Sequence, residues 1–420
     1  MALILKNCRY IVTQNKQRDI LEHDDIRIEE NIIAGISSQS VTAEDKVIDC
    51  SQHIVMPGLA NMHTHLGMTF LRGSGEDMEL MQWLEKKILP AERRLKDHDV
   101  YRWTYHGAVE ALKSGTTTVC DFYFFPFSMA KAIEDVGLRA WVGSDVQDKK
   151  TPHADSVDAA LWLSEQFIDA YKKHLLITPI AYAHSPYACS EKTLHNVKKL
   201  AEKYTVRFAM HLAETRYEVD YCKQKYGVFP VQAVANLGLC DDNTIFAHCT
   251  WITKDEIKML GGAVVVHNPI SNMKLASGST LPIPELIAAS VCVGLGTDSA
   301  ASNNNLDMFE EMKVAGLLQK FHRWDTSALP VQQILDMATC NAGVALKKPF
   351  GVLAAGYLAD VIVLDLSEHL LPIDKERVIN HLVYSAKGSD VCTVIVDGSV
   401  RYHDSKFIPQ LAGTEGIVRL

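Results

Sequence analysis

The feature that most constrains the fold is a series of eight short apolar segments between residues 58 and 350, each ending in a polar side chain capable of chemistry. These segments end at His65, Asp121, Ser144, His184, His211, His248, His267 and Asp298. Helical patterns, as in residues 156–171 and 190–203, separate most of them, and alternating strands and helices predict a parallel sheet. Eight parallel strands with functional side chains at their carboxyl ends predict a (β/α)₈ barrel.

The two ends of the chain have a different sequence pattern, in which short β-type runs are not separated by long helical ones. Short β-type runs, such as residues 10–13 and 32–36, precede Pro57-Gly58, and similar runs return at 360–365 and 391–396. We therefore expect residues 1–57 and 351–420 to pair into one composite β-sandwich domain. The predicted fold class is α/β, with this small domain beside a barrel over residues 58–350.

Composition favours a small-molecule substrate. The 42 Lys and Arg residues against 51 Asp and Glu give a net charge of -9, and no long basic run occurs, which argues against nucleic acid or an anionic membrane as partner. The ten cysteines form no C-x-x-C pair, which is typical of a reducing compartment. No apolar run approaches the roughly 18 residues of a membrane span, and no signal-peptide core is visible, so a cytoplasmic location is expected.

Histidines and a carboxylate at these strand ends indicate a metal site. His63 and His65 are two apart on one presumed strand, so both side chains leave the same face. His211, His248 and Asp298 close later strands of the same barrel. Alone, an H-x-H pair fits two unrelated surface histidines equally well. Together, these side chains suit Zn²⁺, and Fe²⁺ or Mn²⁺ also fit the ligand types.

Glu214 follows His211 by three residues. It could be an ordinary solvated carboxylate at a helix start, but beside a metal it becomes a candidate proton shuttle. Zinc lowers the pKa of bound water towards neutrality, and a nearby acid must protonate the leaving group. The pattern therefore predicts metal-dependent hydrolysis.

Motifs along nearly the whole chain resemble the amidohydrolase superfamily, in its deaminase and chlorohydrolase branch, and within that branch most closely the 5-methylthioadenosine/S-adenosylhomocysteine deaminases. The motifs that carry the resemblance are residues 56–65, 83–92, 184–187, 211–215, 248–249, 267–269, 296–299 and 356–360. The resemblance implies a barrel with a flanking β-sandwich, one catalytic divalent metal per subunit, and hydrolytic loss of ammonia from an aminated purine ring.

The resemblance also implies roles for individual residues. The implied metal ligands are His63, His65, His211 and Asp298. Asp298 would also accept the proton of the attacking water, and Glu214 would protonate the ring nitrogen and assist the departure of ammonia. His248 would orient or stabilise the hydroxide.

Three further residues would bind substrate. Glu92 would grip the ribose hydroxyls, His184 would contact the substrate, and Trp83 could pack on the nucleoside. From the sequence alone, core packing in the amphipathic stretch 78–95 is the commoner role for a residue such as Trp83, and a structural role is the commoner one for His184. Glu92 equally fits a surface ion pair with the adjacent Arg93 and Arg94.

Two differences from other members of the superfamily narrow the predicted metal content and substrate. Members of the superfamily that hold two metals usually carry a lysine or glutamate at the end of the fourth strand, where this chain has His184, so a mononuclear site is expected. Members that handle S-adenosylhomocysteine can use an arginine after the third strand, where only Lys149 and Lys150 are near. A smaller 5'-modified adenosine would need no arginine.

Other readings stay open. The same site could serve a guanine, pterin or triazine ring, and a catalytically inactive scaffold is the remote alternative. The purine nucleoside would be the partner molecule, and a homo-oligomer is possible, although no residue pattern fixes a number of subunits.

Overall fold

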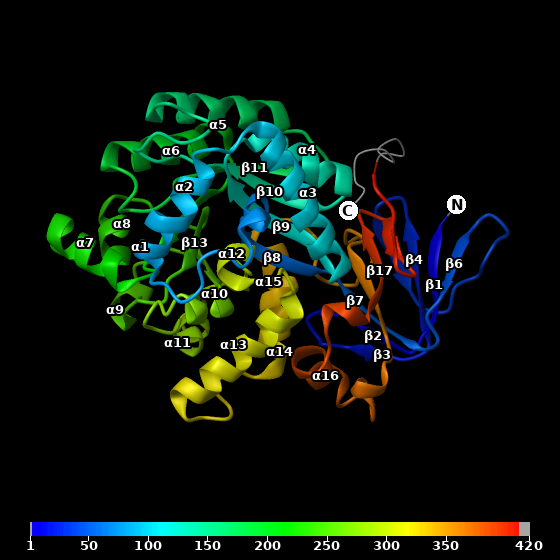
Figure 1. Cartoon of the computed structure of the whole chain (residues 1–420). Helices are drawn as coiled ribbons and strands as arrows, with labels where there is room; N and C mark the ends of the chain where they lie inside the picture. Colours follow the sequence, from blue (N-terminus) through cyan, green and yellow to red (C-terminus); the bar gives the residue numbers. More distant parts are fainter. Residues whose placement is uncertain (1, 411–420) are drawn as a thin grey trace.

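Eight parallel strands form a barrel at the centre of the computed structural model, which describes residues 2–410 (Figure 1). Each strand pairs with the next along the chain, and a bridge from Thr64 to Asp298 joins the first strand to the segment after the last. The strands are β8 (Leu59–Thr64), β9 (Thr116–Tyr123), β10 (Arg139–Ser144), β11 (Ile177–Tyr182), β12 (Phe208–Leu212), β13 (Thr244–His248), β14 (Val264–His267) and β15 (Val293–Leu295). The predicted fold class is confirmed, because all eight expected segments form barrel strands.

Helices follow the strands and pack around the barrel (Figure 1). Two of them begin where the sequence supplies a hydroxyl cap: Ser156 accepts a hydrogen bond from the backbone of Ala159, and Ser190 from that of Thr193. The principal helices are α3 (Asp97–Lys113), α4 (Pro126–Val136), α5 (Val157–Tyr171), α6 (Glu191–Tyr204), α7 (Arg216–Tyr226), α8 (Pro230–Asn236), α11 (Ile283–Ala288), α13 (Met308–Arg323) and α14 (Val331–Ala338).

Short helices carry residues of the barrel mouth. A long insertion after β8 holds η1 (Leu66–Leu71), α1 (Leu80–Trp83), the π-helical η2 (Leu84–Ile88) and α2 (Leu89–Glu92). Later connections hold α9 (Lys254–Ile257), α10 (Pro269–Lys274) and α12 (Ala300–Asn303), and α15 (Cys340–Ala345) follows α14.

Two sheets lie beside the barrel (Figure 1), the first built from N-terminal strands alone and the second from strands of both chain ends. The first has the order β5-β4-β1-β6 and the second β19-β18-β17-β16-β7-β2-β3. Their strands are β1 (Leu3–Cys8), β2 (Tyr10–Val12), β3 (Ile20–Leu21), β4 (Asp24–Glu29), β5 (Ile32–Ile36), β6 (Lys46–Asp49), β7 (His53–Pro57), β16 (Val361–Asp365), β17 (Val391–Val396), β18 (Ser399–His403) and β19 (Lys406–Phe407). Antiparallel pairing of β7 with β16 joins the two chain ends, as expected.

The expected domain limits remain a prediction, and residues 1 and 411–420 of those ranges lie outside the described residues. Short helices connect strands of the second sheet: η3 (Glu368–Leu370), α16 (Val378–Tyr384) and η4 (Gly388–Asp390). Within residues 2–410, no helix has the length and apolar character needed to span a membrane. The ten cysteines, all of them described, are unpaired.

The barrel interior is a packed core and not an open channel. Large side chains from successive strands fill it, among them Met62, Phe122, Trp141, Tyr182 and Ile245. Phe350, which follows the barrel, joins the same cluster. Because the interior is filled in this way, polar strand-end residues meet at the carboxyl-terminal mouth, where barrel enzymes place their sites.

Candidate active site

Four side chains from three parts of the barrel converge at its mouth. Nε2 of His65 lies 3.3 Å from Oδ1 of Asp298 and 3.3 Å from Nε2 of His211, and Nε2 of His63 lies 3.5 Å from the same Asp298 oxygen. His63 and His65 leave β8 and the segment that follows it, His211 belongs to β12, and Asp298 follows β15. The backbone fixes the closing contact, since the N–H of Asp298 donates to the carbonyl of His63 at 2.9 Å.

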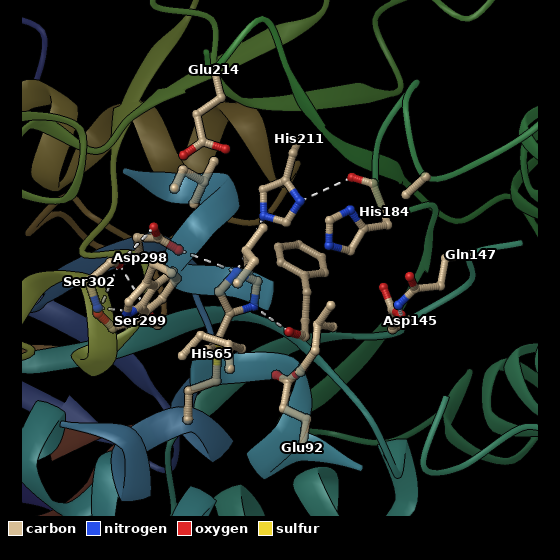
Figure 2. Close-up of a pocket in the computed structure, with 18 of the residues that line it drawn as sticks. His65, Glu92, Asp145, Gln147, His184, His211, Glu214, Asp298, Ser299 and Ser302 are labelled. Atoms are coloured by element: carbon tan, nitrogen blue, oxygen red, sulfur yellow. Dashed lines mark hydrogen bonds and ion pairs between the residues drawn. The ribbon is translucent and has the colours of Figure 1, made fainter. Parts of the chain in front are cut away.

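The opposite edges of the imidazoles show which nitrogens are free to bind a metal. Nδ1 of His65 donates to the carbonyl of Phe122, and Nδ1 of His211 donates to the carbonyl of His184 at 3.0 Å (Figure 2). A carbonyl can only accept, so each Nδ1 carries the hydrogen and each Nε2 presents a lone pair to the cluster. Nε2 of His63 is buried without a hydrogen-bond partner among the described residues. This donor set fits a divalent metal.

Charge within the cluster also fits a cation. Burial would raise the pKa of Asp298, but the adjacent imidazoles of His63 and His65 hold it well below its usual value. Burial lowers the pKa of His63 to about 3. Burial also acts to lower the pKa of His65, but the adjacent carboxylate of Asp298 outweighs that effect and raises the pKa of His65 to about 9. The carboxylate therefore attracts positive charge to the point where the lone pairs converge.

Asp298 is held by its other oxygen. Oδ2 accepts hydrogen bonds from the hydroxyls of Ser271 at 2.6 Å and Ser302 at 3.0 Å, which leaves Oδ1 towards the histidines. Figure 2 shows Ser302 beside Asp298. Its backbone is left-handed, with φ +60, a conformation that costs free energy in a residue other than glycine and often occurs at functional sites.

Glu214 and His248 adjoin this cluster. Glu214 follows β12 with 6% of its surface exposed, and burial, followed by the negative charge of Asp298, raises its pKa to about 8. Nε2 of His248 lies 4.0 Å from Oε2 of Glu214. The amide of Asn272 donates to Nδ1 of His248 at 3.0 Å, which leaves Nε2 of His248 to carry the hydrogen that faces the site.

Comparison with known proteins places the chain in a family. The model of the family described as the amidohydrolase family matches residues 54–401. The chain belongs to the amidohydrolase family. A 5-methylthioadenosine/S-adenosylhomocysteine deaminase of Thermococcus sibiricus is 40% identical, over 95% of this chain and 94% of its own length. A 5'-deoxyadenosine deaminase of Methanosarcina acetivorans is also 40% identical, over 95% and 92%.

Solved structures support the same assignment. An adenosine deaminase from Xanthomonas campestris with bound zinc shares 32% identity and a TM-score of 0.93, covering 97% of this chain and 94% of its own. A guanine deaminase from C. acetobutylicum shares 23% identity with a TM-score of 0.87, covering 95% of this chain and 100% of its own, and supports the fold alone.

In this amidohydrolase, one cavity unites nearly all the residues that the sequence singled out. The predicted residues that line it are His65, Trp83, Glu92, His184, His211, Glu214, His248 and Asp298. His63 is absent from the cavity wall and is 2% exposed. Lys149 lines the same cavity, whereas Lys150 does not and pairs instead with Asp155.

The three predicted substrate-binding residues differ in their surroundings. Glu92 is 7% exposed and accepts a hydrogen bond from the hydroxyl of Tyr123 at 2.7 Å, so the alternative of a surface ion pair is wrong. Burial raises the pKa of Glu92 to about 7. Trp83 is buried, and its indole N–H donates to the carbonyl of Ser74 at 3.0 Å, so it combines core packing with a place in the cavity wall. His184 is half-buried in that wall.

Several polar residues of the amidohydrolase site were not predicted. Ser271, Ser302 and Asn272 lie on α10 and α12, short helices after β14 and β15, and they act on site residues through single hydrogen bonds. Tyr123 and Asp145 come at the ends of β9 and β10. The strand-end rule could have found these two, because each lies within two residues of a polar end already noted.

Proposed function

We propose that the protein is a metal-dependent hydrolytic deaminase that converts an adenosine-type nucleoside to the corresponding inosine-type product and ammonia. One observation carries this proposal: the donor cluster, the buried acid Glu214 and the buried acceptor Glu92 line or adjoin one cavity. The relatives at 40% identity, named as deaminases of 5-methylthioadenosine, S-adenosylhomocysteine and 5'-deoxyadenosine, support the substrate class.

His63, His65, His211 and Asp298 would hold the divalent metal, and zinc is the ion that these ligands suit best. When bound, the metal would supply a nucleophilic water at neutral pH. Asp298, which its lowered pKa keeps ionised, would be the group that accepts the proton of the attacking water. Nε2–H of His248 would orient that water.

Glu214 supplies the proton that makes the ring carbon electrophilic. Its raised pKa leaves the carboxyl group protonated at pH 7, so it can donate to the ring nitrogen next to the amino group. The same group then assists the departure of ammonia. Oxygens of Glu92 accept the ribose hydroxyls, His184 contacts the substrate, and Trp83 contributes to the wall of the cavity.

The deciding experiment is ammonia release by the metal-analysed protein. The panel contains adenosine, 5'-deoxyadenosine, 5-methylthioadenosine, S-adenosylhomocysteine, guanine and a triazine. Turnover of the adenosine compounds supports the proposal. Turnover of guanine or the triazine alone would contradict it, because a ring without ribose gives Glu92 nothing to hold. Turnover of nothing, together with no bound metal, would favour an inactive scaffold.

The cellular setting is part of the same proposal. Ten unpaired cysteines support a reducing, cytoplasmic location. Self-association of the chain stays a prediction, which a measurement of native mass in solution tests.

A further inference from the structure

Besides Glu92, Glu214 and Asp298, the cavity wall holds one more buried carboxylate, that of Asp145. Asp145 directly follows β10, lines the cavity, and is 3% exposed. Gln147 donates to its Oδ2 at 2.7 Å, whereas no donor among residues 2–410 reaches Oδ1. Figure 2 shows the Asp145–Gln147 pair on the far side of His184 from Asp298 and Glu214. Oδ1 of Asp145 therefore borders the cavity free to accept a hydrogen bond from a ligand.

The charges around this end of the cavity favour a donor over an anion. Burial raises the pKa of Asp145, while His153 and Gln147 oppose that rise, and the charge of Asp145 in turn helps to raise the pKa of Glu92. The cation that lines the cavity nearby is Lys149, which is exposed. A carboxylate placed between Asp145 and Glu92 would meet two acidic groups that are buried, while the one cation is screened by water.

The place of Asp145, on the far side of His184 from Glu214 (Figure 2) and near enough to Glu92 to affect its pKa, assigns it to one part of the substrate. The proposed function, on which this inference rests, places the purine at Glu214 and the ribose hydroxyls at Glu92. The part of the nucleoside then left for the far end is the 5' carbon with its substituent. We propose that Asp145 forms the 5' subsite and takes a hydrogen-bond donor there, a hydroxyl or an ammonium group, in preference to a thioether or a carboxylate.

The test compares nucleosides that differ only at the 5' position. Adenosine and 5'-deoxyadenosine differ by one hydroxyl, and 5'-amino-5'-deoxyadenosine replaces it with an ammonium. We expect kcat/KM of the metal-loaded wild type to favour adenosine over 5'-deoxyadenosine by about tenfold or more, because a buried acceptor is left unpaired by the analogue that lacks the donor. The kcat/KM for 5-methylthioadenosine should be as low, relative to adenosine, as that for 5'-deoxyadenosine.

Variants separate the acceptor from its charge. In Asp145→Leu, which removes the acceptor at similar volume, the adenosine to 5'-deoxyadenosine ratio should fall towards one. In Asp145→Asn, which keeps an acceptor without charge, the preference for the 5'-amino compound should fall at least fivefold. Asp155→Asn is the matched control, since Asp155 is 82% exposed and its substitution makes the same charge change. Its ratios should equal those of the wild type.

The outcomes distinguish the two proposals. If no adenine nucleoside reacts, the proposed function fails and the 5' subsite fails with it. If the nucleosides react but the wild type treats adenosine and 5'-deoxyadenosine alike, or Asp145→Leu keeps the wild-type ratio, the 5' subsite alone is overturned. Should thermal melting show Asp145→Leu to be unfolded, Asp145→Asn decides: an unchanged preference for the 5'-amino compound overturns the inference, and a fivefold fall supports it.

Discussion

At the scale of single residues, Glu214 is the group whose chemistry is easiest to isolate. Glutamine has almost the same shape but cannot give up a proton to the ring. We expect Glu214→Gln to keep the wild-type metal content and to lose turnover by about 10³-fold or more, because general acid catalysis is removed while the binding cavity stays intact. Metal analysis and ammonia release on the same sample check this. Retained turnover would refute the proton-transfer role.

Glu92 shows how a binding residue can lower stability. Its pKa is about 7 in the folded chain against an ordinary 4.5, so the folded state holds the proton more tightly. The resulting stabilisation is complete below pH 4.5 and is lost as the pH rises through about 7. Glutamine cannot ionise, so a variant with glutamine at this position does not lose stability in this way as the pH rises. We expect Glu92→Gln to gain about 2–3 kcal/mol more over wild type at pH 8 than at pH 5, measured by urea unfolding.

The control for this linkage is Glu85→Gln, because Glu85 lines the same cavity but is exposed. Its stability difference from wild type at each pH is the baseline with which that of Glu92→Gln is compared. An equal difference at pH 5 and pH 8 for Glu92→Gln would show that the carboxyl group is not shifted by burial.

At the scale of elements, the loop between β12 and α7 is held by a carboxylate from the helix. Glu218 of α7 is fully buried and accepts the backbone N–H groups of Ala213 at 2.8 Å and Glu214 at 3.2 Å. Ala213 has a left-handed φ of +51. The loop that carries Glu214 therefore depends on Glu218 for its shape.

Removing this carboxylate should disturb catalysis without touching the substrate. We expect Glu218→Ala to lower kcat about 10–100-fold with metal retained, since a small displacement of a catalytic group costs that much. Glu218→Gln keeps one accepting oxygen and should recover part of the rate. A shared loss of kcat and metal in both variants would indicate general unfolding instead of a positioning role.

The elements also show what a sequence can predict here. Strand ends could be predicted because parallel strands bring their carboxyl ends to one mouth, which placed His65, His211 and Asp298 together from spacing alone. Ser271 and Ser302 could not, because they lie on short helices whose orientation depends on tertiary packing. The burial of Glu92 escaped prediction for the same reason, since the insertion that carries it folds back to border the cavity.

At the scale of the whole molecule, an ion pair ties the barrel to the sheets of the chain ends. Arg139, the first residue of β10, donates from Nε to Oδ2 of Asp360 at 2.7 Å and from Nη2 to Asp397 at 2.7 Å. Arg139 and Asp360 are 3% and 2% exposed. Burial would lower the pKa of Arg139, but Asp360 and Asp397 together raise it.

Breaking this pair should be costly because it leaves a buried charge without a partner. We expect Arg139→Leu to lower the free energy of unfolding by about 3–5 kcal/mol, and the further change Asp360→Leu to recover part of that loss. Denaturant titration of the metal-loaded variants measures both. The exposed Lys150–Asp155 pair is the control, because Lys150→Leu should change stability by less than about 1 kcal/mol. An equal loss of stability in Arg139→Leu and Lys150→Leu would show that the buried ion pair does not stabilise the fold.

The pairing of β7 with β16 also sets an order for biosynthesis. Gly58 alone separates β7 from β8, and it has no room for a side chain, since an added Cβ would lie 2.1 Å from Thr117. On the ribosome, β7 emerges before the whole barrel, and its antiparallel partner β16 emerges after it. One edge of β7, with its unpaired backbone N–H and C=O groups, therefore stays open through most of translation. β8, the strand that carries His63, therefore directly follows a strand, β7, whose partner β16 is synthesised only after the whole barrel.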